Sequence, residues 1–121
     1  MKAIRKRLPH QVGRAGEAYA IRLLSQRGFT IQACNVQVGR AEIDIIARKG
    51  ELLAFIEVKT RKHHAFGYPE SFVSDAQQDL YHQAATTYMD QLHWATDIRF
   101  DIIAIEKHPY YTQCFHFEDA F

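Results

Sequence analysis

Residues 42–60 have the sequence EIDIIARKGELLAFIEVKT, which predicts two antiparallel strands joined by a tight turn. We expect the strands at Glu42–Arg48 and Glu51–Thr60, with the pair Lys49-Gly50 as a two-residue loop. This loop pairs Arg48 with Glu51 and Glu57 with Glu42, and it makes Asp44 a diagonal neighbour of Glu57, at roughly 7 Å. Because side chains alternate along a strand, one face of the hairpin is aliphatic. The other face carries a charged group of side chains: Glu42, Asp44, Glu57 and Lys59.

The flanking segments predict two helices and three more strands. Pro9 and Gly28 suit the two ends of a helix over Pro9–Gln26, and Ser74 with Gln77 fits a capping box at the start of a helix over Asp75–His93. The second helix has an apolar stripe at a four-residue spacing: Phe72, Ala76, Leu80, Ala84, Tyr88 and Leu92. The further strands are expected at Phe29–Val38, Ile98–Glu106 and Thr112–Phe117. The order αβββαββ predicts an α/β fold in which helices flank a mixed sheet.

Composition indicates one globular domain over residues 1–121, with a basic tail at 1–8. The 47% hydrophobic and 24% charged residues do not suggest disorder. Only two cysteines are present, Cys34 and Cys114, which are too few for a zinc ribbon or a disulfide framework, so we expect free thiols in a reducing cytoplasm. No signal peptide is recognised, and no stretch approaches the roughly 18 apolar residues of a membrane span.

Basic residues gather in two places although the net charge is only +1. The first cluster includes Arg5, Lys6, Arg7 and Arg14, and the second runs through Lys59, Arg61, Lys62, His63 and His64. Such patches can bind the phosphates of a nucleic acid, but a solvated tail and a solvated loop would have the same composition.

The charged face of the hairpin is costly near a core, because three close carboxylates repel one another. A divalent cation removes that cost, and Mg²⁺ prefers one or two carboxylates and retains several waters. Lys59 could then orient an attacking water or stabilise charge on a phosphoryl group. The alternative is a solvent-facing sheet with cross-strand salt bridges. Glu17 lies at the edge of an apolar helical stripe, where it either joins these acids or pairs at the surface with Arg14 or Arg22.

Asp44 followed by Glu57-x-Lys59 on the next strand resembles the PD-(D/E)XK nuclease pattern, and the chain as a whole resembles the YraN-like family of small bacterial proteins. The resemblance covers about residues 12–106. It rests on seven stretches: Gly13-x-x-Gly16-Glu17, Gly28-Phe29, Asn35, residues 41–47 (AEIDIIA), residues 55–61 (FIEVKTR), Phe66-Gly67 and Arg99-Phe100-Asp101.

The resemblance implies a restriction-endonuclease-like core similar to archaeal Holliday junction resolvases. It makes Asp44 and Glu57 ligands of Mg²⁺ or Mn²⁺, Lys59 the catalytic lysine and Glu17 a further contributor from the first helix. By the same resemblance, Val58 adds its backbone carbonyl and Glu42 is an outer-sphere ligand. Two positions depart from the family pattern. Ala41 stands where glycine is usual, and Gln77, expected near the scissile phosphate, stands where lysine is usual.

These observations favour a metal-dependent endonuclease that acts on DNA, including branched or structured DNA. Binding would rest on the two basic clusters and would show little sequence specificity. A homodimer would supply two sites for two cuts. The alternative, which Gln77 favours, is a non-catalytic module that binds nucleic acid or an unidentified protein partner.

Three other features have less specific interpretations. His63-His64 is expected in a solvated or DNA-facing loop rather than at a zinc ion. Residues 66–69 (FGYP) either anchor a loop on the core or wedge into a DNA junction. Asp101 is expected to be a structural acid paired with a basic side chain, and neither cysteine is expected to be catalytic.

Overall fold

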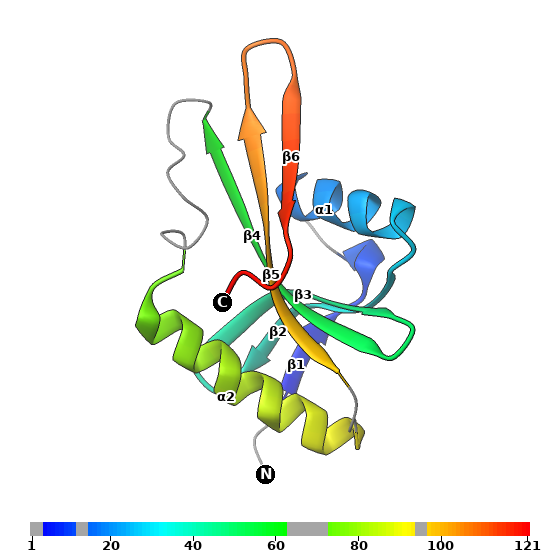
Figure 1. Cartoon of the computed structure of the whole chain (residues 1–121), viewed down its shortest axis with the longest axis vertical. Helices are drawn as coiled ribbons and strands as arrows, with labels where there is room; N and C mark the ends of the chain where they lie inside the picture. The colour runs from blue at the N-terminus through cyan, green and yellow to red at the C-terminus, as the bar shows by residue number, and fades with distance from the viewer. Residues whose placement is uncertain (1–3, 12–14, 63–72, 94–96) are drawn as a thin grey trace.

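The computed structural model describes residues 4–11, 15–62, 73–93 and 97–121. A six-stranded mixed sheet has the order β1-β2-β3-β4-β5-β6, and two helices flank it (Figure 1). All neighbouring strands are antiparallel except β4 and β5, which are parallel because the chain crosses between them through α2. The elements are β1 (Ile4–Arg7), the 3-10 helix η1 (Pro9–Gln11), α1 (Ala15–Gln26), β2 (Thr30–Val38), β3 (Ala41–Lys49), β4 (Leu52–Lys62), α2 (Asp75–Leu92), β5 (Ile98–Lys107) and β6 (Thr112–Phe117).

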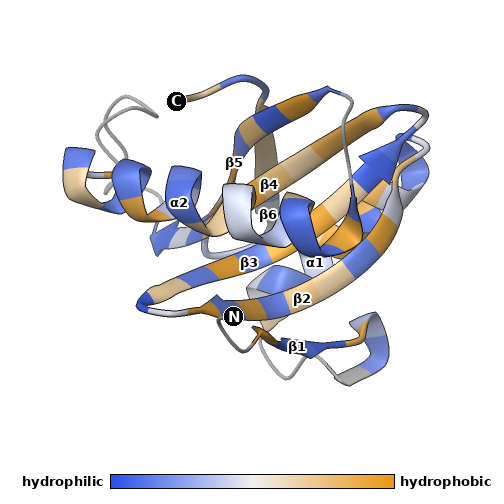
Figure 2. Cartoon of the chain, turned by 90° about the horizontal axis from the view of Figure 1, so that it is seen from below, coloured by the Kyte–Doolittle hydropathy of each residue, from blue (hydrophilic) through white to orange (hydrophobic). Residues whose placement is uncertain are grey.

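The sheet separates two apolar cores, one under each helix. Phe55 and Phe100 stack at 5.5 Å between ring centroids on the α2 side, where Tyr81 also packs. Ile56 and Ile103 lie on the opposite face, against α1. Figure 2 shows the resulting hydrophobic central strands between the helices, whereas β1 is mostly hydrophilic. The predicted α/β class, a mixed sheet flanked by helices, is confirmed, and the architecture is consistent with a restriction-endonuclease-like core.

The N-terminal segment differs from the prediction. Ile4–Arg7 forms the edge strand β1 against β2, where a basic tail was expected. Pro9 starts only the short helix η1, and α1 begins at Ala15 rather than at Pro9. Ile4 packs against the core under α2, which gives this segment an apolar reason to join the sheet.

The predicted hairpin register is wrong by two residues. Lys49 pairs with Leu52, so the loop is Gly50-Glu51 rather than Lys49-Gly50. Gly50 has φ of 61°, and a hairpin loop with a positive φ at its first residue favours glycine there. Because the shift is an even number of residues, the paired residues from Ile45 to Ile56 keep their predicted faces. Ile43 does not, since it packs in the core under α2, whereas Ile45 packs in the core under α1. The described pairing ends at Ile45 and Ile56, and Asp44 and Glu57 are the next residues of the two strands.

Helix α2 has the predicted bounds to within one residue, and the predicted apolar stripe is confirmed in part, at Ala84 and Tyr88. The buried residues are Tyr81, Ala84, Ala85 and Tyr88, whereas Leu92 is exposed and Phe72 lies outside the described residues. Ser74 caps the helix by accepting a hydrogen bond from the Gln77 backbone, as predicted. The side chain of Gln77 does not complete the capping box, because it points to Glu57. None of the helices within the described residues is long and apolar enough to cross a membrane.

Candidate functional site

Three acidic side chains from three different elements are buried at one place on the sheet. Glu17 of α1, Asp44 of β3 and Glu57 of β4 are 3%, 8% and 6% exposed. Glu17 therefore is not the surface acid that pairing with Arg14 or Arg22 would require. Glu42, which precedes Asp44 by two residues, is exposed at the rim of the group. Burial of several acids is costly without cations, so this cluster calls for a physical explanation.

The cluster forms where β3 and β4 separate. The described β3–β4 pairing ends at Ile45 and Ile56. Beyond that point the Val58 N–H donates to Asp44 Oδ2 at 2.7 Å, and the Asp44 backbone forms a hydrogen bond with the Tyr81 hydroxyl. Both backbone groups of a strand residue point toward the same neighbouring strand, so the Val58 carbonyl also faces this opening.

Glu57 is held by three side chains. Tyr81 donates its hydroxyl hydrogen to Oε2, and Gln77 Nε2 donates to Oε1 at 3.4 Å. Lys59 Nζ lies 3.1 Å from the same Oε1, and its side chain is one-fifth exposed. Gln77 and Tyr81 are four residues apart, one turn of α2, so a single helix face presents both to the carboxylate. The structure thus brings Asp44, Glu57, Lys59 and Gln77 together.

Glu17 reaches the site through Asn35. The Asn35 amide donates to Glu17 Oε2 at 2.8 Å. Asn35 lies between Cys34 and Val36, whose partners on β3 are Ile45 and Ile43, and therefore sits opposite Asp44. Its φ of 48° is in the left-handed region, which is rare within a strand and is tolerated best by asparagine after glycine. A strained residue is thus retained beside the acids, as is common at functional sites.

The electrostatics of Asp44 reflect this crowding. Burial, and then the charges of Glu57, Glu17 and Glu42, raise the pKa of Asp44 to about 8, although the hydrogen bond from Val58 opposes the shift. Burial and the charge of Glu57 also raise the pKa of Tyr81 far above its ordinary value. A carboxyl whose pKa is raised by neighbouring acids is the arrangement that a bound cation would relieve.

The oxygen atoms at this site fit a hard divalent cation that takes only a few of its ligands from the protein. Asp44 and Glu57 supply carboxylate oxygens, and the Val58 carbonyl faces the same opening. Within the described ranges, no group of three or more His, Cys, Asp or Glu side chains is arranged to hold a metal ion. Two carboxylates suffice for Mg²⁺, which keeps several waters, whereas zinc would need nitrogen or sulfur ligands that the site lacks.

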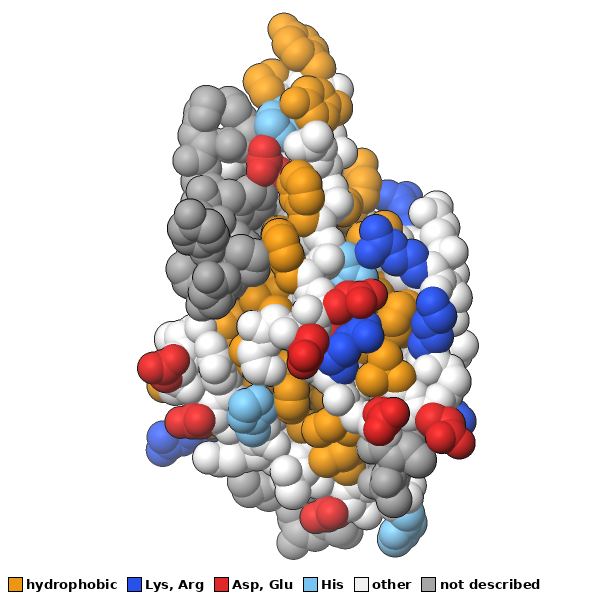
Figure 3. Space-filling model, viewed as in Figure 1, with side chains coloured by type: hydrophobic (Ala, Val, Ile, Leu, Met, Phe, Trp, Pro, Cys, Tyr) orange, Lys and Arg blue, Asp and Glu red, His pale blue; other side chains and the backbone are white. Residues whose placement is uncertain are grey.

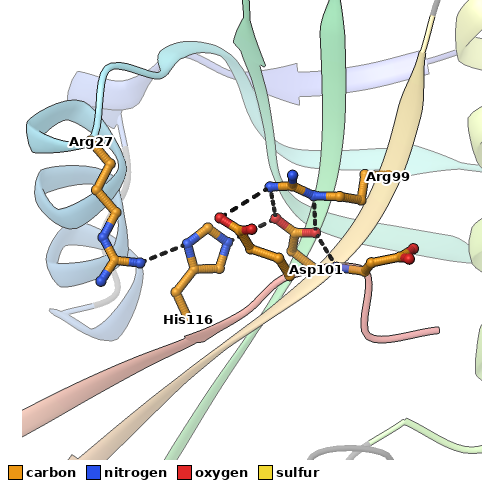
Figure 4. Close-up of polar contacts among 6 residues, drawn as sticks. Arg27, Arg99, Asp101 and His116 are labelled. Atoms are coloured by element: carbon orange, nitrogen blue, oxygen red, sulfur yellow. Dashed lines mark hydrogen bonds and ion pairs between the residues drawn. The ribbon is translucent and has the colours of Figure 1, made fainter.

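A fourth buried acid, Asp101 of β5, lies outside this cluster and has basic partners (Figure 4). Arg99 binds both of its oxygens at 2.8 and 2.9 Å, His116 contacts Oδ2 at 2.8 Å, and the Asp119 N–H donates to Oδ1. Arg27, in the turn that follows α1, lies 3.0 Å from the other ring nitrogen of His116. Burial opposes ionisation of Asp101, but these hydrogen bonds outweigh it and lower its pKa. The prediction of a structural acid is confirmed.

Comparison with known proteins identifies the family. The model of the "Uncharacterised protein family UPF0102" matches residues 16–105. This chain belongs to the UPF0102 family. A UPF0102 protein of Cytophaga hutchinsonii is 41% identical over 95 residues, which cover 78% of this chain and 84% of that protein. One from Flavobacterium psychrophilum is 39% identical over 112 residues, 93% and 94% of the two chains, and one from Dictyoglomus turgidum is 43% identical over 101 residues, 82% and 85%.

The basic residues of this UPF0102 chain flank the acidic site. Arg5, Lys6 and Arg7 are exposed on β1 and line a cavity of about 290 Å³ together with Asn35, Gln37 and Glu42. Arg61 and Lys62 are exposed at the end of β4, beyond Lys59. The predicted contributions of Arg14, His63-His64 and residues 66–69 lie outside the described residues.

Two residues of this UPF0102 site were not predicted as members of it. Tyr81 was missed because a tyrosine on an amphipathic helix is more often part of the core, and only its four-residue spacing from Gln77 could have singled it out. Asn35 was noted for its resemblance but given no role. Both cysteines are free, as expected. Burial, and then the charge of Glu17, raise the pKa of Cys34 to about 11, which is unfavourable for thiol catalysis.

Proposed function

We propose that this chain is a metal-dependent endonuclease that hydrolyses phosphodiester bonds in DNA, including branched or structured DNA. The observation that carries the proposal is the burial of Asp44, Glu57 and Glu17 at the point where β3 and β4 separate, with Lys59 beside them. The Asp44 and Glu57-x-Lys59 pattern supports a relation to the PD-(D/E)XK nucleases.

In this proposal each side chain has a distinct role. Asp44, Glu57 and the Val58 carbonyl hold Mg²⁺ or Mn²⁺, and Glu42 acts at the rim through water. The bound ion would polarise a phosphoryl oxygen and lower the pKa of a coordinated water. Lys59 orients the attacking water or stabilises the charge that develops on the phosphate. Tyr81 and Gln77 fix the Glu57 carboxylate, and Asn35 fixes Glu17, so the ligands are positioned before the substrate binds.

Phosphate contacts would come from both sides of the site. Arg5, Lys6 and Arg7 lie toward β1, Arg61 and Lys62 lie beyond Lys59, and Arg14 is included from its sequence position. Contacts of this kind bind DNA without reading its sequence, and their affinity falls as salt rises. Because the proposed substrate is DNA, we infer that the chain acts in the cytoplasm.

Calorimetric titration with Mn²⁺ and Mg²⁺ tests the metal site. The wild type is expected to bind, and Asp44→Ala and Glu57→Ala are expected to weaken binding at least about tenfold. Asp79→Ala is a matched control, because Asp79 is an exposed acid on α2 outside the site. Equal metal binding by wild type and both site variants would remove the basis of the proposal.

A cleavage assay tests the reaction. Plain duplex, flap, gapped and four-way-junction DNA are incubated with Mn²⁺ and either wild type or Lys59→Ala. We expect the variant to cut about 10²- to 10³-fold more slowly, the usual cost of losing one donor that stabilises the transition state. An enzymatic function is rejected if the wild type cuts none of the substrates or if the variant cuts as fast.

A second candidate is a non-catalytic module that binds nucleic acid or protein. It is favoured by one observation, namely that both oxygens of Glu57 already have protein partners, Tyr81 on one side and Gln77 with Lys59 on the other. This candidate predicts DNA binding that neither requires metal nor leads to cleavage, and the two experiments above separate it from the nuclease.

A further inference from the structure

Exposed aromatic side chains form a row along the edge strand β6. Phe115 is 40% exposed, Tyr111 immediately before the strand is 56% exposed, and Phe117 is half-buried. Figure 3 shows hydrophobic side chains from the tip of the β5–β6 hairpin down along β6. Such a row on an accessible sheet face is unusual for a protein surface and commonly marks a binding site.

The row lies on the same face of the sheet as the candidate site. Lys59 of β4 pairs with Ala104 of β5, and Ala104 pairs with Phe115 of β6, so the three lie in one line across the sheet. Glu57, Ile102 and Phe117 form the next line. Adjacent strands are about 4.8 Å apart, so Phe115 lies roughly 10 Å from Lys59 between backbone positions. The small side chain of Ala104 does not project far from the sheet, so it does not form a barrier between Lys59 and Phe115.

The rings are arranged as successive flat surfaces. The His108 N–H donates to the Tyr111 carbonyl, so Tyr111 continues the β5–β6 ladder and shares the alternation of β6. Tyr111, Phe115 and Phe117 therefore occupy alternate positions on one face over about 20 Å of strand. Phe115 and Phe117 are nearly parallel, with centroids 6.4 Å apart and planes at 23°, and Tyr111 stacks on His108 at 4.2 Å and 11°.

The charges beside the row suit a polyanion. Lys59 and Arg61 lie on this face of β4, and His108 lies beside Tyr111 near the tip. The one acid in the line of Arg61 is Glu106, which is paired with His108. Aromatic faces beside cations are the combination with which proteins hold unpaired nucleotides, because every base has a face that stacks.

We propose that Tyr111, Phe115 and Phe117 form a stacking platform for unpaired nucleotides of a DNA strand that leads to Lys59. This inference rests on the proposed nuclease function and narrows its substrate class to DNA with a single-stranded segment beside the cut. The platform holds bases, while Lys59 and Arg61 hold phosphates.

Fluorescence anisotropy of a labelled twelve-nucleotide oligo-dT, measured in a metal chelator, tests the platform without cleavage. Phe115→Ala and Tyr111→Ala are each expected to weaken binding about 5- to 100-fold with an unchanged salt dependence, because stacking is lost while phosphate contacts remain. Phe115→Leu keeps an apolar side chain without a ring, so it should show the same loss if the fold is intact. Tyr110→Ala is the matched control, since Tyr110 is 97% exposed in the hairpin turn but outside the alternation of the strand.

The binding and cleavage measurements distinguish the platform from its alternatives. The proposal is overturned if Phe115→Leu and Phe115→Ala bind oligo-dT as the wild type does, or if Tyr110→Ala weakens binding equally. It is also overturned if light scattering shows a wild-type dimer that Phe115→Ala converts to a monomer with unchanged affinity, because the row would then serve self-association. If the wild type binds oligo-dT through these residues but cuts no DNA substrate, the platform is supported and the nuclease function is rejected. If the protein cuts plain duplex DNA and Phe115→Ala cuts it equally fast, the nuclease function stands and the platform is rejected.

Discussion

Asp44 and Asp101 are two buried aspartates in strands of one sheet, and their surroundings have opposite character. Asp101 is enclosed by Arg99, His116 and a backbone N–H, which lower its pKa despite complete burial. Asp44 receives one backbone hydrogen bond from Val58, and burial together with the charges of Glu57 and Glu17 raises its pKa to about 8. Burial alone therefore does not decide the direction of the net pKa shift of an aspartate, because the groups that surround the carboxylate can outweigh it.

The largest expected effect is on folding stability. Asp101→Asn should lower the free energy of unfolding by about 3–5 kcal/mol, because it leaves Arg99 and His116 without their acid. The matched change Asp44→Asn, measured in a chelator, should cost little or should stabilise, because it removes repulsion among acids. Urea denaturation of both variants decides this, and equal losses would erase the distinction between the two aspartates.

A bound metal ion should change the stability of the two aspartate variants by different amounts. At about 100 times its Kd, Mn²⁺ is expected to raise the free energy of unfolding of the wild type by about 2.7 kcal/mol, since it binds only the folded state. Asp101→Asn should gain the same increment, whereas Asp44→Asn should gain almost none. The increments are read from unfolding curves with and without the ion. A gain in Asp44→Asn equal to that of the wild type would show that the ion binds elsewhere.

The two aspartates should also respond oppositely to pH. In a chelator, the folded pKa of Asp44 lies above its unfolded value of about 3.9, so its favourable contribution is complete below that pH and is lost as pH rises toward 8. Asp101 has a lowered folded pKa, so its contribution is present above about 3.9 and is lost as pH falls through the folded value. The limiting slope is about 1.4 kcal/mol per pH unit for each proton. Differences between the wild type and each Asn variant, measured across pH, give the two profiles, and slopes of the same sign would contradict this account.

The smallest expected effect comes from removing the Tyr81 hydroxyl, which holds the Glu57 carboxylate in place. Tyr81→Phe removes a hydrogen bond to Glu57 and should cost about 1.5 kcal/mol of stability, together with about a tenfold loss of metal affinity. Tyr88→Phe, two turns later on the same helix and also buried, should leave metal affinity unchanged. Thermal unfolding and calorimetry provide both readouts. Equal metal affinities in the two variants would mean that Tyr81 only fills space.

The success of sequence-based prediction was uneven for physical reasons. The faces of β3 and β4 between Ile45 and Ile56 followed from the two-residue alternation, and the error in the register did not change them because it was even. The alternation fails at Ile43, which packs under α2 rather than with Ile45 under α1. The register itself depended on which loop residue takes a positive φ, which the Lys49-Gly50-Glu51 stretch leaves open. Strand β1 was missed because three cations in a row resemble a tail, and pairing with β2 outweighs that composition.

The contacts of the site were less accessible from sequence than its acids. Asp44, Glu57 and Lys59 share one short hairpin, so local periodicity was enough to group them. Tyr81 and Asn35 come from separate elements, and their roles depend on how closely α2 approaches the sheet and on a left-handed residue within β2. Neither quantity has a signature in a single sequence.

Gly16 immediately precedes Glu17 and lies where α1 packs closely against Thr60 of β4. A side-chain carbon at this position would collide with the hydroxyl of Thr60 and would also touch Ile105 at 3.5 Å. A larger residue would require either the Thr60 side chain or the start of α1 to shift, and a shift of the helix would move the Glu17 carboxylate relative to Asn35. Glycine at position 16 therefore allows α1 to pack closely on β4, and this close packing helps to place Glu17, the least exposed acid of the cluster.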